Sequence, residues 1–171
     1  MFEKYKFRKH SCSYFRLFQR EKIKVKKILG SQALIKHVGS TAIKGLGGKG
    51  IVDIVIALPK KSLNSGRKKL IEAGYIFKYV SEVTERDFFF REYIYRRNAR
   101  RVHLHLTFEK SIEYKRLVSF VKYMNSHPND VKEYICIKKE AVKYAKGEGK
   151  KYRYYKDKFL KELFLKSLME S

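Results

Sequence analysis

Tryptophan is absent from this 171-residue sequence, and proline and cysteine occur only twice each. The cysteines, Cys12 and Cys136, form no CxxC pair, which argues against a zinc ribbon or a disulfide framework. We expect both to be free, buried thiols in a reducing cytoplasm, in preference to a disulfide or a metal site. The sequence also lacks internal repeats and low-complexity linkers, so we expect residues 1–171 to form one domain.

Long apolar runs are missing as well. No segment approaches the roughly 18 to 20 apolar residues that a membrane span requires. The first ten residues, MFEKYKFRKH, lack the apolar centre of a secretion signal. We therefore expect a cytoplasmic protein with no membrane partner.

Acidic residues are scarce: 17 Asp and Glu stand against 41 Lys and Arg, which gives a formal net charge of +24. Such an excess attracts polyanions at long range, and nucleic acid is the commonest of them. A lysine-rich surface that serves only solubility is the competing interpretation. Because 44% of the residues are hydrophobic, the chain can build a packed core and is not a disordered basic tail.

Hydrophobic periodicity predicts both strands and helices. The β-branched apolar run at 51–58 is typical of a central strand buried on both faces, and residues 101–108 alternate as a half-buried strand does. Further strands are expected at 33–38, 75–80 and 88–95, and helices at 14–29, at 62–73 and in three pieces from 111 onward. This order predicts an α+β (mixed α/β) fold, in which helices flank a small mixed sheet and the C-terminal helices form a layer.

The segment HVGSTAIKGLGGKGIVDIVIAL, residues 37–58, carries the most informative pattern. Gly39 lets the backbone approach a ligand closely, and Ser40 offers a hydroxyl and an N–H to phosphate oxygens. Asp53 lies within an apolar run, where a carboxylate is costly unless it binds a cation or is fully hydrogen-bonded. We interpret the pair of features as a functional site in preference to a structural aspartate.

Two histidines supply further candidate ligands. His103 and His105 are two residues apart on a predicted strand, so their side chains share a face and can reach one ion. Strand histidines that face solvent or are merely hydrogen-bonded are the competing interpretation, and for an isolated H-x-H pair it is the favoured one. His37, just before the Gly-Ser turn, either joins them or braces the loop. If the site is built as expected, Asp53 lies within about 6 Å of Ser40 and of one of these imidazoles.

The hexapeptide RRNARR, residues 96–101, places four arginines in a predicted turn. Clustered guanidinium groups suit a polynucleotide backbone, whereas a solvated hairpin tip is the alternative. The predicted polynucleotide contacts are Arg96, Arg97, Arg100 and Arg101.

Further motifs extend along most of the chain, in a characteristic order. They comprise segments 37–46, 49–54 and 103–105, together with Phe18, Glu21, Val25, Leu29, Gly30, His127, Pro128, Tyr134, Lys138, Tyr152, Lys156 and Phe159. From residue 14 to residue 163 this pattern resembles the GrpB-like family of the nucleotidyltransferase superfamily.

The resemblance implies a nucleotidyltransferase-like fold that binds a nucleoside triphosphate. It implies Mg²⁺ (or Mn²⁺) as cofactor, with metal and catalytic roles for Asp53, His103 and His105. The residues it implies for nucleotide or phosphate binding are His37, Gly39, Ser40, Thr41, Lys49, Lys138 and Lys156.

Three positions depart from these patterns. The superfamily commonly has a second carboxylate two residues after the first, where this chain has Val55. Lys44 and Gly50 stand where the family pattern has prolines, which predicts a looser loop with an added cation.

The leading hypothesis is a metal-dependent nucleotidyltransferase that moves a nucleotide from a nucleoside triphosphate to an unknown acceptor, with RNA as one candidate. The alternative is a non-catalytic nucleotide- or RNA-binding module with a degenerate site. A small-molecule transferase is the third. The missing carboxylate favours the module, whereas the enzyme is favoured by Gly39, Ser40, Asp53, His103 and His105.

Overall fold

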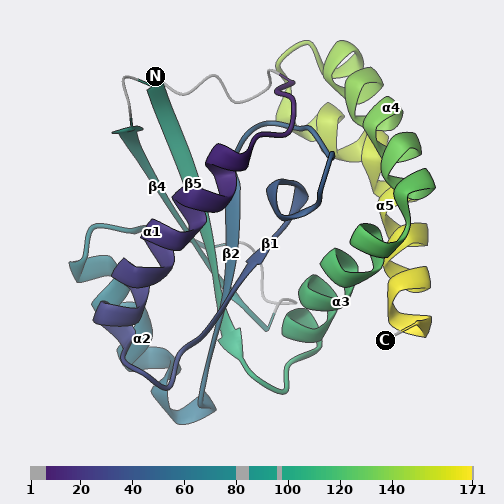
Figure 1. Cartoon of the computed structure of the whole chain (residues 1–171). Helices are drawn as coiled ribbons and strands as arrows, with labels where there is room; N and C mark the ends of the chain where they lie inside the picture. Colours follow the sequence, from purple (N-terminus) through teal and green to yellow (C-terminus); the bar gives the residue numbers. More distant parts are fainter. Residues whose placement is uncertain (1–6, 80–84, 96–97, 171) are drawn as a thin grey trace.

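A five-stranded mixed sheet forms the centre of the molecule, with helices on both sides (Figure 1). The computed structural model describes residues 7–79, 85–95 and 98–170. The strands are β1 (Leu34–Val38), β2 (Val52–Leu58), β3 (Ile76–Lys78), β4 (Asp87–Tyr95) and β5 (Asn98–Phe108). The helices are α1 (Cys12–Leu29), α2 (Leu63–Glu72), α3 (Ile112–Ser126), α4 (Pro128–Ala145) and α5 (Gly149–Met169), with short 3-10 turns η1 (Ser40–Ala42) and η2 (Lys60–Ser62). The predicted mixed α/β fold with a C-terminal helical layer is confirmed.

The strands lie in the order β1-β2-β5-β4-β3, and β2 and β5 are the parallel neighbours. β2 lies between β1 and β5, as its continuous apolar sequence predicts. The pairing register sets Asp53 directly opposite His103, and Val55 opposite His105. The site residues of these two strands are therefore adjacent because of the register.

The two faces of the sheet serve different purposes. On one face, alternate residues of β2 and β5, such as Ile54 and Leu104, pack with Leu17 and Val25 of α1 and Leu70 of α2 in one apolar core. Alternation turns Asp53, His103 and His105 to the other face, which α3 approaches. Helices α3, α4 and α5 therefore lie beside the face that carries the polar residues (Figure 1).

The C-terminal helices have an apolar core of their own. Phe120 and Met124 of α3 pack with Tyr134 of α4 and Leu163 of α5, and Ile43 and Leu46 of the loop before β2 join this cluster. The loop after the Gly-Ser turn is thereby attached to the helical layer. Because α4 begins at Pro128 and α3 ends just before it, the His-Pro pair separates these two helices as expected.

Two expectations are corrected here. The predicted turn at 96–101 is shorter, because Asn98 to Arg101 already pair with β4 as part of β5; Arg96 and Arg97 lie outside the described residues. Both cysteines are free, but Cys12 and Cys136 are exposed, not buried, since each lies on the outer side of a helix.

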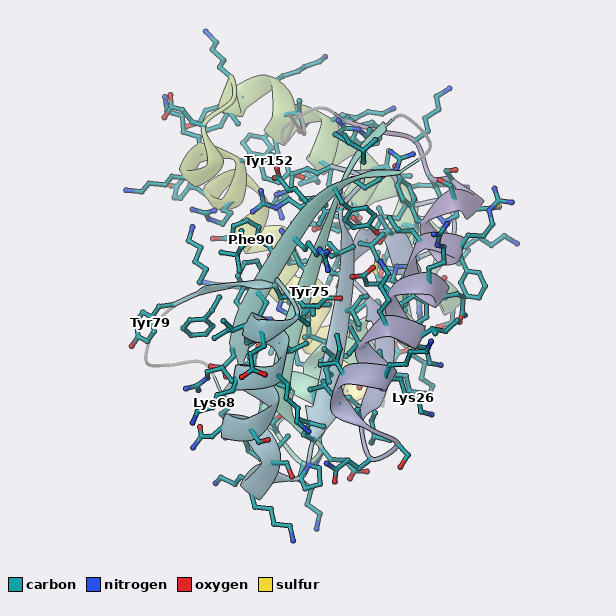
Figure 2. The ribbon with its side chains drawn as sticks, turned by 90° about the vertical axis from the view of Figure 1, so that its left-hand side faces the viewer. Lys26, Lys68, Tyr75, Tyr79, Phe90 and Tyr152 are labelled. Atoms are coloured by element: carbon teal, nitrogen blue, oxygen red, sulfur yellow. The ribbon has the colours of Figure 1, made fainter. Side chains whose placement is uncertain are left out.

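Lysine side chains cover much of the outer surface. Lys26 on α1 and Lys68 on α2 project outward, whereas Tyr75 lies between the helices and the sheet (Figure 2). In the described part of the chain, no helix is both long enough and apolar enough to cross a membrane.

Candidate nucleotide-binding site

The Gly-Ser turn lies against Asp53. Gly39 has φ 68° and ψ −171°, a conformation that is essentially open to glycine alone. A Cβ added there would be 2.5 Å from Asp53 Oδ2. Only glycine therefore permits the backbone before Ser40 to approach the carboxylate so closely.

A chain of hydrogen bonds holds Asp53 from the other side. The Nε of Arg101 donates to His103 Nε2 at 3.1 Å, and a guanidinium can only donate. His103 therefore carries its proton on Nδ1, which donates to Asp53 Oδ1 at 3.0 Å. Arg101 is itself held by Glu92 at 2.5 Å. The hairpin of β4 and β5 thus determines which imidazole nitrogen faces the carboxylate.

His105 lies beside the same carboxylate oxygen. Its Nε2 is 3.6 Å from Asp53 Oδ1, and its Nδ1 has no hydrogen-bond partner among the described residues. Burial lowers the pKa of His105, so its imidazole is neutral near pH 7. Burial alone would raise the pKa of Asp53, but the neighbouring imidazoles of His103 and His105 outweigh it and lower that pKa. Asp53 is therefore an ionised carboxylate.

His37 and Thr41 brace the loop. The Thr41 hydroxyl donates to the Ile51 carbonyl at 3.1 Å, so it accepts from His37 Nε2 at 3.0 Å. The His37 ring stacks on Phe18, and burial is the main cause that lowers its pKa to about 4. Neither residue lines the cavity described next. The structure thus places both beside the predicted phosphate site instead of within it.

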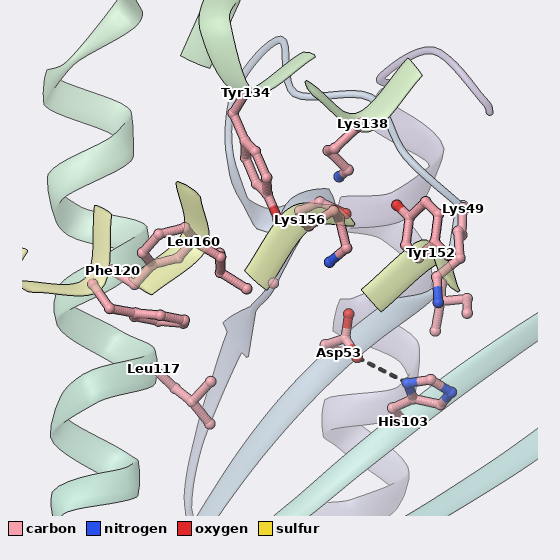
Figure 3. A pocket seen from close by; sticks show the side chains of 14 residues that line it. Lys49, Asp53, His103, Leu117, Phe120, Tyr134, Lys138, Tyr152, Lys156 and Leu160 are labelled. Atoms are coloured by element: carbon pink, nitrogen blue, oxygen red, sulfur yellow. Dashed lines mark hydrogen bonds and ion pairs between the residues drawn. The ribbon is translucent and has the colours of Figure 1, made fainter. Parts of the chain in front are cut away.

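A cavity of about 220 Å³ lies between Asp53 and the C-terminal helices (Figure 3). One part of its wall is polar and includes Gly39, Ser40, Asp53 and His103. The rest of the wall combines lysines and tyrosines with apolar side chains, namely Ile51, Lys49, Lys138, Lys156, Tyr134, Tyr152, Leu117, Phe120, Leu160 and Phe164. The structure therefore brings together most of the sequence-predicted phosphate-binding residues in one place.

Three lysines approach this cavity from three different segments. Lys138 of α4 is 3% exposed, and its Nζ donates to the Gly47 carbonyl at 2.7 Å. Burial is the main cause that lowers the pKa of Lys138 and that of Lys156 on α5. Lys49 precedes β2, and its Nζ lies 5.1 Å from the centre of the Tyr152 ring. Figure 3 shows the Lys138 and Lys156 ammonium groups directed into the space above Asp53.

The described part of the cavity wall offers few donors to the expected magnesium centre. Mg²⁺ is usually held by one or two carboxylates and by other oxygens, and Asp53 is the one carboxylate that the described residues contribute to the cavity wall. Its Oδ1 already accepts from His103, and its Oδ2 lies against Gly39. Within 7–79, 85–95 and 98–170, no group of three or more His, Cys, Asp or Glu side chains is placed to hold a metal ion. The metal role of Asp53, His103 and His105 therefore stays a prediction; in the structure the Nδ1 of His103 donates to the carboxylate itself.

Sequence reasoning missed two features of the site. Arg101, expected at a phosphate backbone, is bound to Glu92 and His103, although its spacing of two residues from His103 signals that both share a strand face. The apolar wall from α3 and α5 carries no such signal, because ordinary core residues have the same pattern. Arg100 is a half-buried residue of β5 outside this cavity, and its contact with polynucleotide stays a prediction.

Two solved structures share this architecture. The chain superposes on the Cid1 poly(U) polymerase bound to MgGTP with a TM-score of 0.54 at 12% identity, covering 80% of this chain and 44% of that one. The conserved protein GrpB from Enterococcus faecalis gives a TM-score of 0.83 at 21% identity, covering 96% and 98%. The fold is thus nucleotidyltransferase-like.

The sequence comparisons give the family. Residues 5–166 match the family described as GrpB protein. The glutamate-rich protein GrpB of Alkalihalophilus pseudofirmus is 30% identical over 158 residues, which is 90% of each chain. The UPF0157 protein YqkA of Bacillus subtilis is 27% identical over 84% of this chain and 41% of its own length. The chain belongs to the GrpB family, and the resemblance noted in the sequence is confirmed.

Proposed function

We propose that this protein binds a nucleoside triphosphate by its phosphates in the cavity and transfers a nucleotidyl group to an acceptor. One observation carries the proposal: the Gly-Ser turn and Asp53 face Lys138 and Lys156 across a single cavity. Backbone N–H groups, a hydroxyl and ammonium groups are the donors that recognise phosphate oxygens. The nucleotidyltransferase-like fold supports this assignment.

The residues of the cavity wall take distinct parts in the proposed binding and transfer. Ser40, Lys138 and Lys156 hold the phosphate oxygens and offset the charge that develops on them during transfer. The apolar wall of Phe120, Leu160 and Phe164 excludes water from one side of the cavity. A cavity of about 220 Å³ is below the range of roughly 300 to 1,000 Å³ that ligand pockets usually have. We therefore place the phosphates inside and the base toward the opening.

RNA is the acceptor that the charge favours. A net charge of +24 raises the local concentration of polyanions whatever their sequence. The charge alone supports nucleic acid over a small neutral acceptor, and Arg96, Arg97 and Arg100 are the proposed contacts.

A non-catalytic nucleotide-binding module is the second candidate. The observation that favours it is that Asp53 is the one carboxylate among the described residues of the cavity wall and that its Oδ1 already accepts from His103. Transfer of phosphoryl groups usually relies on metal ions that carboxylates help to hold. Such a module would bind the nucleotide as proposed and leave it unchanged.

The two candidates are separated by one labelling experiment. The purified protein is incubated with each α-labelled nucleoside triphosphate and cellular RNA, in Mg²⁺, in Mn²⁺ and in chelator. Label that enters RNA in the parent but not in an Asp53→Asn variant supports the transferase. Nucleotide binding with no transfer to any acceptor supports the module, and absence of nucleotide binding under all three conditions contradicts both.

A further inference from the structure

We propose that the cavity anchors a di- or triphosphate chain with lysine ammonium groups in place of a divalent cation. This inference rests on the proposed function and specifies how the phosphates are held. It follows from four features of the cavity: a buried lysine with unused donors, a glycine that places it beside Ser40, an excess of positive charge, and aromatic rings that position the ammonium groups.

Lys138 has donors to spare. It is almost fully buried, yet the Gly47 carbonyl is its one hydrogen-bond acceptor among the described residues. An ammonium carries three N–H donors, so two of them are left for a ligand. A buried charged group is costly unless it is paired, which a phosphate oxygen in the cavity would achieve.

Gly48 brings Lys138 and Ser40 together. A Cβ added at Gly48 would be 2.5 Å from Lys138 Nζ and 3.0 Å from Ser40 Oγ, so both groups lie against the same residue. One phosphate group has enough oxygens to accept from an ammonium and a hydroxyl at once, and bonds to an ionised donor are the stronger kind. The glycine therefore makes room for a phosphate-binding pair.

The charge of the cavity wall favours an anion over a metal. Among the described residues of the wall, the protonated forms of Lys138 and Lys156 oppose the carboxylate of Asp53, so two positive charges minus one negative leave an excess of one. After burial, the charge of Lys156 is the largest cause that lowers the pKa of Lys138. Bound phosphate would relieve this repulsion, whereas a divalent cation would increase it.

Two tyrosines position the ammonium groups without neutralising them. Lys138 Nζ lies 5.1 Å from the centre of the Tyr134 ring, and Lys156 Nζ lies 4.9 Å from that of Tyr152. Lys49 Nζ contacts the same Tyr152 ring at 5.1 Å. A cation–π contact orients a cation and leaves its full charge for an anion. The wall is thus preorganised for phosphate.

The test is calorimetry of inorganic triphosphate and of ATP, each in chelator and in Mg²⁺. We expect triphosphate to bind in chelator with an affinity within about threefold of that in Mg²⁺. The Lys156→Gln variant should bind triphosphate at least about tenfold more weakly, because it loses a charge-assisted bond. Lys158→Gln, an exposed lysine on the same helix outside the cavity wall, is the matched control and should bind like the parent.

The outcomes separate the two proposals. Binding that requires Mg²⁺ would overturn the inference and leave the proposed function standing. Failure of both ligands in both conditions would overturn the two together. Binding of ATP without binding of triphosphate, or equal affinity in the Lys156 and Lys158 variants, would overturn the lysine anchor alone. The same calorimetry on Lys138→Gln, with its fold checked by circular dichroism, tests the second lysine of the anchor and should also show weaker binding of triphosphate.

Discussion

At the residue scale, two histidines support the site by hydrogen bonds to protein groups. The Nδ1–H of His103 donates a hydrogen bond to Asp53, because the other ring nitrogen accepts one from Arg101. The Nε2–H of His37 donates a hydrogen bond to the Thr41 hydroxyl. That hydroxyl donates in turn to the Ile51 carbonyl, just before the strand that carries Asp53. These hydrogen bonds orient the Gly-Ser loop and the carboxylate.

The lowered pKa of His37 should make the stability of the protein depend on pH. Its pKa in the folded protein is about 4, below the ordinary 6.5, so between these values the unfolded chain binds a proton that the folded chain does not. The free energy that neutral His37 contributes to folding is fully present above pH 6.5. It is lost as the pH falls toward 4, by up to about 1.4 kcal/mol per pH unit. The free energy of unfolding of the parent and of His37→Gln is measured by denaturant titration. We expect the difference in the free energy of unfolding between the parent and the variant to shrink as the pH falls from 6.5 to 4. A difference that stays constant over this range would contradict the pKa assigned to His37.

At the element scale, short loops between strong elements place the site. The loop from the end of β1 to the start of β2 contains Gly39, Gly45 and Gly50 with positive φ, and Leu46 fastens it to the helical layer. The absence of the two family prolines, at Lys44 and Gly50, predicts a looser loop. Burial of Ile43 and Leu46 shows instead that packing holds this loop, since both side chains are at most 1% exposed.

Alanine substitutions at two glycines should separate backbone strain from close contact. Gly39→Ala is destabilised by an unfavourable backbone conformation and also by a Cβ that would be 2.5 Å from Asp53 Oδ2. Gly45→Ala is destabilised by the backbone conformation alone, because no atom lies within 4 Å of its added Cβ. We expect about 1–2 kcal/mol of destabilisation at Gly45 and at least about 1 kcal/mol more at Gly39. Urea denaturation measures both variants. Equal losses would show that the carboxylate moves away freely.

At the scale of the whole molecule, the sheet carries one polar and one apolar face, and the excess charge is spread over the outside. Lysines project from α1 and α2 as well as from the C-terminal helices (Figure 2). A spread of this kind favours long-range attraction, while local clusters decide where a polyanion is held.

RNA affinity should therefore depend steeply on salt. For about five phosphate contacts on a single strand, the slope of log affinity against log salt should be near −3.5. Replacing Arg96, Arg97 and Arg100 with alanine should flatten it by about two units, at about 0.7 per contact. Arg101 is left intact because it holds His103.

The matched control removes the same charge elsewhere. Lys26, Lys68 and Lys69 are exposed on α1 and α2, and their triple alanine variant should keep the parent slope. Binding is measured by fluorescence anisotropy over a range of salt concentrations. Equal flattening in both variants would assign the effect to net charge alone, and a slope near zero in the parent would remove RNA as a partner.

The sequence by itself determined what depends on neighbouring residues. The β-branched run at 51–58 specified the buried strand β2, and strict alternation set His103 and His105 on one face. Gly30 and Pro128 marked helix ends, because the first has a positive φ and the second suits the first turn of a helix. The Gly-Ser turn and Asp53 were identified as the site from their residue types and their place beside the strand.

Only the tertiary structure decided how these parts meet. The register of β2 against β5 set His103 opposite Asp53, and the packing of α4 and α5 brought Lys138 and Lys156 to the same cavity. It also turned the expected metal ligands toward one another, which no local pattern encodes. The physical reason is that local spacing determines the direction of a side chain within its element. The distance between elements depends on long-range apolar contacts that form only when the whole core is packed.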